Sequence, residues 1–226
     1  MKIKLLFILF IFLIQTISFS QQKLGIKAGI GFSRLSTNHN TNSIYVGNYS
    51  EISDEIKLSG QLGFYYSYDF NNKYYLGSEL LFLQIETEQK IKYYQNSNPL
   101  DNLTSTSNYT VNDEQNISYI GLPVYIGVNL NKMKIDLGIQ VNYLIGSKGK
   151  TVGEGTNYGQ GITYDNLNIN NLDYGPRIGA SVNLTQNIWI EGNYYYGMKN
   201  INKTYEKKWK VRQFTISLKF DFIKLN

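Results

Sequence analysis

Residues 133–144 alternate between apolar and polar side chains almost without interruption. Successive side chains of a β-strand point to opposite faces, so this pattern indicates a strand that separates two different environments. The apolar positions are Met133, Ile135, Leu137, Ile139, Val141 and Tyr143, and the polar ones are Lys134, Asp136, Gly138, Gln140 and Asn142. Comparable patterns cover residues 24–33, 56–69, 74–85, 117–130, 174–184, 188–198 and 214–222. We therefore expect an all-β chain of about eight strands.

The first twenty residues have the pattern of an export signal. Lys2 and Lys4 precede an apolar run from Leu5 to Ile14, and small residues such as Ser18 and Ser20 come before a cleavage point ahead of Gln21. The alternative, a membrane anchor, needs about 20 apolar residues, which is more than this run provides. The sequence thus predicts a signal peptide at 1–20 and one domain at 21–226. Because the chain contains no cysteine, no disulfide can form.

The connections between the expected strands alternate in length. Those at 69–73, 131–132 and 185–186 are tight, whereas those at 34–55, 86–116, 146–173 and 199–209 are long and polar. This alternation is typical of an eight-stranded antiparallel up-and-down transmembrane β-barrel, with short turns in the periplasm and long loops outside the cell. We expect it to close by pairing of the first and last strands, with both termini in the periplasm of a bacterium and the barrel in lipid of the outer membrane.

Alternation alone does not say which face points inward, and a soluble lipocalin-like ligand-binding barrel would enclose the apolar face. Two features favour the membrane orientation. The polar face mixes glycines with single charges that suit the lumen of a narrow barrel, and the apolar face carries aromatic residues near the tight turns, as in a lipid-facing girdle. The expected lumen residues are Lys27, Glu79, Asp136, Arg177, Glu191 and Lys219. The expected girdle residues are Tyr66, Tyr68, Phe70, Tyr74, Phe220 and Phe222.

Two local irregularities stand out within the strands. Leu81 and Leu83 interrupt the alternation of the third strand, which suggests a β-bulge. Pro123 lies in the middle of the fourth strand, where its missing N–H predicts a bulge or a break in the pairing. Eight strands leave an interior that side chains just fill, so we do not expect an open pore.

Several segments resemble a known family. These are the strand 24–29, the acid Glu79 within 77–80, the segment 120–123 and the aromatic final strand. Together they look like the PorT-type outer-membrane β-barrel domain, and the resemblance covers essentially the whole mature chain. It implies the barrel fold and the outer membrane, and the namesake of the family takes part in type IX protein secretion. The final strand also resembles the aromatic signal that the barrel assembly machinery recognises in its clients.

Candidate chemistry is sparse, and we predict no enzyme activity, cofactor or metal site. The single histidine, His39, lies in the first long connection without a patterned serine and acid beside it. Glycines 153, 155, 159 and 161 precede no helix that would complete a phosphate cradle. Loop residues Asp165, Asn168, Asn170 and Asp173 offer calcium-type oxygen ligands, although Asn and Asp also favour turns for local reasons.

The remaining features concern binding. Tyr93, Tyr94 and Tyr109 flank a stretch rich in Asn, Ser and Thr, a composition that suits surface contact or a solvated variable loop. The formal net charge is +5, but the basic residues are scattered, which gives no support for a nucleic-acid partner. We therefore expect a non-enzymatic outer-membrane barrel that binds a protein partner through its long loops or docks in an envelope assembly. The alternative within this class is a component of a type IX-like secretion apparatus.

Overall fold

The structure is a computed structural model that describes residues 22–38, 48–70, 73–95, 108–154, 161–165, 167–203 and 208–225. The expected signal peptide at 1–20 and His39 lie outside these ranges. The described chain forms strands β1 (Gln22–Asn38), β2 (Asn48–Glu55), β3 (Lys57–Asp69), β4 (Tyr74–Gln95), β5 (Asn108–Leu130), β6 (Met133–Glu154), β7 (Ile162–Asp165), β8 (Leu172–Thr185), β9 (Ile188–Tyr196) and β10 (Lys208–Leu225). The described residues contain no helical segment that could span a membrane.

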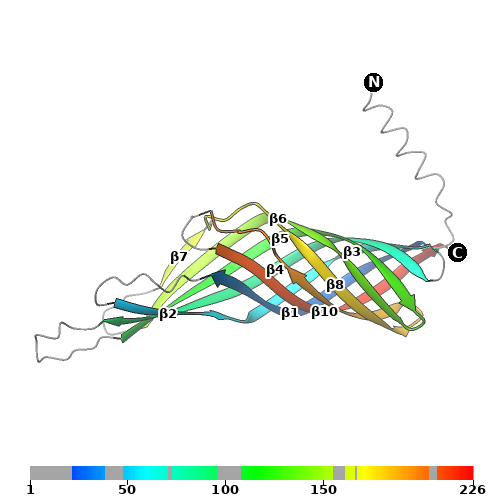
Figure 1. Cartoon of the computed structure of the whole chain (residues 1–226). Coiled ribbons are helices and arrows are strands. Elements are labelled where there is room, and N and C mark those ends of the chain that lie inside the picture. The colour runs from blue at the N-terminus through cyan, green and yellow to red at the C-terminus, as the bar shows by residue number, and fades with distance from the viewer. Residues whose placement is uncertain are drawn as a thin grey trace, which may run out of the picture.

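Eight of these strands close into an antiparallel ring. Its order is β4, β3, β1, β10, β9, β8, β6 and β5, and β5 pairs back onto β4. The first and last strands pair along their whole length, from Gln22 opposite Leu225 to Asn38 opposite Lys208. The predicted eight-stranded antiparallel barrel is therefore confirmed (Figure 1). The tight connection between β5 and β6 contains Asn131, whose φ of 56° is a left-handed conformation that Asn tolerates in two-residue hairpin turns.

The apolar faces of the ring point outward. Ile30 is 73% exposed and Leu62 60% exposed, and comparable side chains line every strand of the ring. The residues between them point inward and are buried, as Lys27 and Gln61 show. This is the reverse of a lipocalin-like barrel, whose apolar face surrounds an internal cavity.

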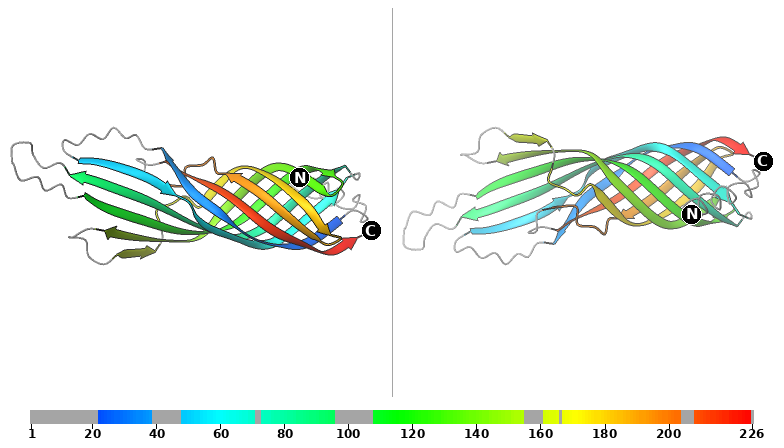
Figure 2. Two further views of the ribbon diagram at one scale, coloured as in Figure 1. Left: turned by 90° about the horizontal axis from the view of Figure 1, so that it is seen from below. Right: turned by 90° about the horizontal axis from the view of Figure 1, so that it is seen from above.

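The strands extend much further than the sequence indicated. The segments 86–95, 108–116 and 146–154, which we expected to be loops, continue β4, β5 and β6 as regular strands. The additional strands β2 and β7 pair with the ends of β4 and β6. The result is a five-stranded sheet in the order β2, β4, β5, β6, β7, which we call the tall sheet. It stands beyond the rest of the barrel at the end away from the tight turns (Figure 2).

The expectation of a bulge at Leu81 and Leu83 is wrong. The pairing of β4 with β3 keeps one register from Tyr75 to Ile85, and both leucines simply point inward. They are apolar because the interior is apolar at this level, so no backbone irregularity is needed. At Pro123 the expectation of a bulge or a break is confirmed, as a break. The β4–β5 ladder lacks two pairs beside the proline but keeps its register, so the pairing is interrupted without a bulge.

Candidate functional site

Six charged side chains meet in the half of the lumen nearer the tight turns. Lys27 Nζ lies 2.8 Å from Glu79 Oε2 and 2.6 Å from Glu191 Oε1. Arg177 donates to Asp136 Oδ1 and Glu191 Oε1, both at 2.6 Å. Lys219 contacts Glu79 Oε1 at 2.9 Å and also pairs with Glu191. We call these six residues the lumen charge cluster: Lys27, Glu79, Asp136, Arg177, Glu191 and Lys219.

The lumen charge cluster balances its own charge. Three cations face three carboxylates, so the formal charges cancel without a bound ion. Two tyrosines that sequence reasoning did not single out complete it, because Tyr125 Oη donates to Glu79 Oε1 at 2.9 Å and Tyr75 Oη to Asp136 Oδ2 at 3.0 Å. Buried charges are tolerated when they are paired and hydrogen-bonded in this way. The signal for both tyrosines was their place on the inward face of β4 and β5.

Glycines make room for these rings. A Cβ atom at Gly77 would overlap the ring of Tyr125, and one at Gly127 would overlap the ring of Tyr75. The two rings contact each other edge-on, with centroids 6.1 Å apart. The inward glycines of this sequence are therefore a steric requirement of a narrow tube that holds aromatic side chains.

Other side chains fill the tube on either side of the lumen charge cluster. Toward the tight turns, Lys23 pairs with Asp69 at 2.6 Å, and a space of about 30 Å³ remains beside Lys134 and Trp189. In the opposite direction the interior becomes apolar. We call this part the apolar plug: Leu35, Leu81, Leu83, Ile85, Ile117, Tyr119, Leu167, Ile169, Tyr195, Ile201 and Val211.

Two connecting segments contribute to the apolar plug. Leu167 and Ile169 come from the segment before β8, and Ile201 comes from the segment before β10. The backbone N–H of Leu167 donates to Ser147 Oγ at 3.0 Å, and Ile169 forms an isolated β-bridge with Asn202. These bonds hold both segments over the inner face of the strands.

The expected girdle residues all lie near the tight turns, on the outward face or at the turn itself. Phe70, Tyr74, Phe220 and Phe222 are exposed, with exposed fractions of 44–50%. Tyr66 and Tyr68 are half-buried, and the ring of Tyr68 packs edge-on against Phe70 with centroids 5.0 Å apart.

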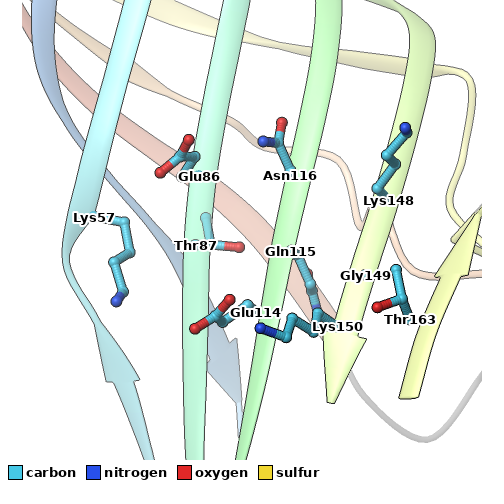
Figure 3. Close-up of a pocket in the computed structure, with 10 residues that line it drawn as sticks. All are labelled: Lys57, Glu86, Thr87, Glu114, Gln115, Asn116, Lys148, Gly149, Lys150 and Thr163. Carbon is cyan, nitrogen blue, oxygen red and sulfur yellow. The ribbon is translucent and has the colours of Figure 1, made fainter. Parts of the chain in front are cut away.

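A pocket of about 310 Å³ lies on the tall sheet. Its lining comes from β4, β5, β6 and β7 together with Lys57 of β3, and Figure 3 shows these side chains: Lys57, Glu86, Thr87, Glu114, Gln115, Asn116, Lys148, Gly149, Lys150 and Thr163. Glu114 and Lys150 are partners in the β5–β6 register. Two polar atoms of the lining, Thr87 Oγ1 and Gln115 Oε1, are buried without a hydrogen-bond partner. The pocket thus combines both signs of charge with unused hydrogen-bonding capacity.

The structure does not bring the calcium-type candidates together. Asp173 is buried and accepts a hydrogen bond from Tyr195 Oη at 2.9 Å, whereas Asn170 Nδ2 donates to the carbonyl of Asn200 at 2.8 Å. Asp165 is exposed and lies 4.0 Å from Lys148 Nζ. Within the described ranges, no group of three or more His, Cys, Asp or Glu residues is placed to hold a metal ion.

A family model for the outer membrane protein beta-barrel domain matches residues 19–203. This chain belongs to that family. Membership agrees with the outward apolar faces and supports a place in the bacterial outer membrane. The resemblance to the PorT-type group of such barrels stays a prediction. A comparison with curated proteins finds no match.

Solved outer-membrane barrels are similar in fold. The attachment invasion locus protein Ail of Yersinia pestis, solved with the heparin analogue sucrose octasulfate, is 14% identical, with 89% of this chain and 99% of Ail covered and a TM-score of 0.42. Neisserial surface protein A is 12% identical, with coverage of 88% and 97% and a TM-score of 0.44. The outer membrane protease OmpT of Escherichia coli is 11% identical, with coverage of 89% and 95% and a TM-score of 0.42.

Proposed function

We propose that this protein is a non-enzymatic outer-membrane barrel whose tall sheet binds a protein partner outside the cell. The observation that carries the proposal is the difference between the barrel lumen and the tall sheet. The lumen is filled by the lumen charge cluster and the apolar plug, whereas the tall sheet offers a polar pocket of about 310 Å³. We infer that the long-connection end faces outward and that both termini lie in the periplasm, as in other bacterial barrels.

The edges of the tall sheet favour a polypeptide as the partner. Along the described strands, β2 pairs with β4 alone and β7 with β6 alone. Each therefore leaves a row of backbone N–H and C=O groups on its far side, to which an extended segment of another protein can add as a further strand. Lys148 and Lys150 of β6, which lies beside β7, would then select acidic side chains of that segment.

The orientation can be tested with single cysteines because the natural chain has none. Lys148→Cys places a thiol on the tall sheet, and Lys132→Cys places one in the tight turn between β5 and β6. We expect a membrane-impermeant maleimide to label the first variant on intact cells and the second only after the outer membrane is opened. Labelling of Lys132→Cys alone on intact cells would reverse the orientation.

Partner binding is tested by replacing charge on the tall sheet. We expect cross-linking on intact cells to capture a protein with the wild type, and Lys148→Glu combined with Lys150→Glu to reduce the captured amount about tenfold or more. Lys132→Glu, at the other end of the barrel, is the control and should capture as much as the wild type. If the double variant captures as much protein as the wild type, the pocket is not the binding site. Capture of secretion proteins, with loss of secretion on deletion, would favour the PorT-like alternative.

A further inference from the structure

The outer wall of the barrel has a groove that runs across β3, β4 and β5 and reaches Leu24 of β1. Its volume is about 230 Å³, and we call it the Pro123 groove. Most of its lining is apolar or aromatic. Ser78 is polar, and Glu79 also lines the groove although its carboxylate lies in the lumen charge cluster. The full lining is Leu24, Phe64, Tyr65, Tyr66, Ser78, Glu79, Leu80, Leu122, Pro123 and Val124. Leu80, Leu122 and Val124 are each about half exposed, so the groove opens on the outward face.

The groove coincides with the interruption of the β4–β5 ladder. Ser78 pairs with Val124 and Leu81 pairs with Gly121, but the two pairs between them are missing. In an antiparallel ladder both missing pairs depend on a bond from the N–H of residue 123 to the carbonyl of Glu79. Proline has no N–H to donate. The interruption is therefore one absent hydrogen bond, and the Glu79 carbonyl is left without its ladder donor.

The Glu79 carbonyl lies deep in the membrane-facing wall, where a missing hydrogen bond is costly. Ser118 is the first polar residue on the outward face of β5 beyond the apolar positions 120–126. With a rise of about 3.3 Å per residue and the usual strand tilt, Pro123 lies ~12 Å from Ser118 along the barrel axis, within the apolar part of the outer surface. Water does not reach a backbone carbonyl at this depth on the outward side, and an unsatisfied one is costly.

We propose that the Pro123 groove binds an acyl chain of a membrane lipid that carries a hydroxyl group in mid-chain. The hydrocarbon lies against Phe64 and Leu122, and the hydroxyl donates to the Glu79 carbonyl. Ser78, on the same outward face of β4, adds a second hydroxyl at the edge of the groove. A charged ligand group is excluded because its transfer from water into hydrocarbon would cost too much hydration free energy. An unsubstituted chain fits the groove but leaves the carbonyl unpaired.

The test is a direct competition between two lipids. The purified full-length barrel is equilibrated in micelles with equal amounts of a 12-hydroxystearoyl phosphatidylcholine and its stearoyl counterpart, and bound lipid is identified by native mass spectrometry. A gained hydrogen bond in an apolar site predicts about five- to tenfold enrichment of the hydroxylated lipid on the wild type. Equal retention of both lipids, or retention of neither, would overturn the proposal.

Two variants and a control assign the preference to the groove. Pro123→Ala restores the N–H, completes the ladder, and should abolish the enrichment. Leu122→Trp fills the groove and should reduce retention of both lipids. Pro176→Ala changes another strand proline, on the outward face of β8, and should preserve the wild-type enrichment. Enrichment that persists in folded Pro123→Ala would show that the carbonyl does not select the lipid.

Discussion

The two halves of the barrel interior are filled by side chains of different chemistry. Near the tight turns, six charged side chains and two tyrosines form one hydrogen-bonded cluster. Toward the other end, leucine, isoleucine and tyrosine side chains form an apolar plug. Both halves fill a tube of the same eight strands. The comparison shows that a narrow barrel can pack its lumen either with paired charges or with an ordinary hydrophobic core.

The two halves also differ in which parts of the chain supply their side chains. Every contact of the lumen charge cluster joins strands of the ring, so it ties β1, β4, β6, β8, β9 and β10 directly together. The apolar plug instead gains part of its volume from segments outside the strands, including Leu167 and Ile201. We infer that the charged half fixes the ring itself and that the apolar half anchors connecting segments onto it.

The largest effect is expected from Arg177→Met. This change removes the cation that joins Asp136 to Glu191 and leaves buried carboxylates without sufficient positive charge. Breaking such a buried network costs about 3–5 kcal/mol of unfolding free energy. Urea unfolding of the barrel in lipid vesicles measures this loss. Arg34→Met, at an exposed arginine of β1, is the control and should stay within about 0.5 kcal/mol of the wild type.

The apolar half is tested by Leu83→Ala. Leu83 is fully buried in the apolar plug, so its truncation leaves a cavity and should cost about 2–5 kcal/mol. Leu62→Ala is the matched control because Leu62 is 60% exposed on the outward face, where lipid chains can refill the space. The same unfolding measurement should give a clearly smaller loss for Leu62→Ala. Equal losses would contradict the assignment of inside and outside.

The sequence predicted the charged half better than the apolar half, for a physical reason. Where the lumen is polar, each strand alternates visibly, so Lys27 and Glu79 could be assigned to the inward face. Where the lumen is apolar, inward residues such as Leu81 and Leu83 resemble their outward neighbours and the alternation disappears. An alternating pattern is visible only where the two faces of a strand differ in polarity. The apolar inward face at Leu81 and Leu83 removed that difference, and we therefore expected a bulge there.

The tall sheet escaped prediction for a related reason. Its strands are polar on both faces, as the run from Glu86 to Lys90 shows, and such segments have the composition of solvated loops. Their extended structure comes from pairing with neighbouring strands rather than from burial of an apolar face. The filled lumen was foreseen from strand number, but the tyrosines that complete the lumen charge cluster depend on register, which composition does not give.

A smaller effect is expected from Tyr125→Phe. The ring stays in place under Arg177, whose guanidinium carbon lies 4.4 Å from its centroid, but the hydrogen bond to Glu79 is lost. A hydrogen bond to a charged group contributes about 1.5–3 kcal/mol, and Glu79 keeps its cation partners, so we expect a loss near the lower value. Tyr194→Phe is the control, because Tyr194 faces outward on β9. A loss as large as that of Arg177→Met would mean that the tyrosine, rather than the ion pairs, organises the cluster.

The smallest effect is expected at the base of the tall sheet, where Lys57 pairs with Glu88. The Lys57 side chain is 38% exposed, so water competes with this pair far more than with the lumen charge cluster. Exposed ion pairs contribute about 0–1 kcal/mol, and Glu88→Gln should change unfolding free energy by no more than that. High salt should reduce the small difference further, while leaving the effect of Arg177→Met largely intact. A loss at Glu88→Gln as large as that in the lumen would show that the tall sheet, like the lumen, excludes water around its charges.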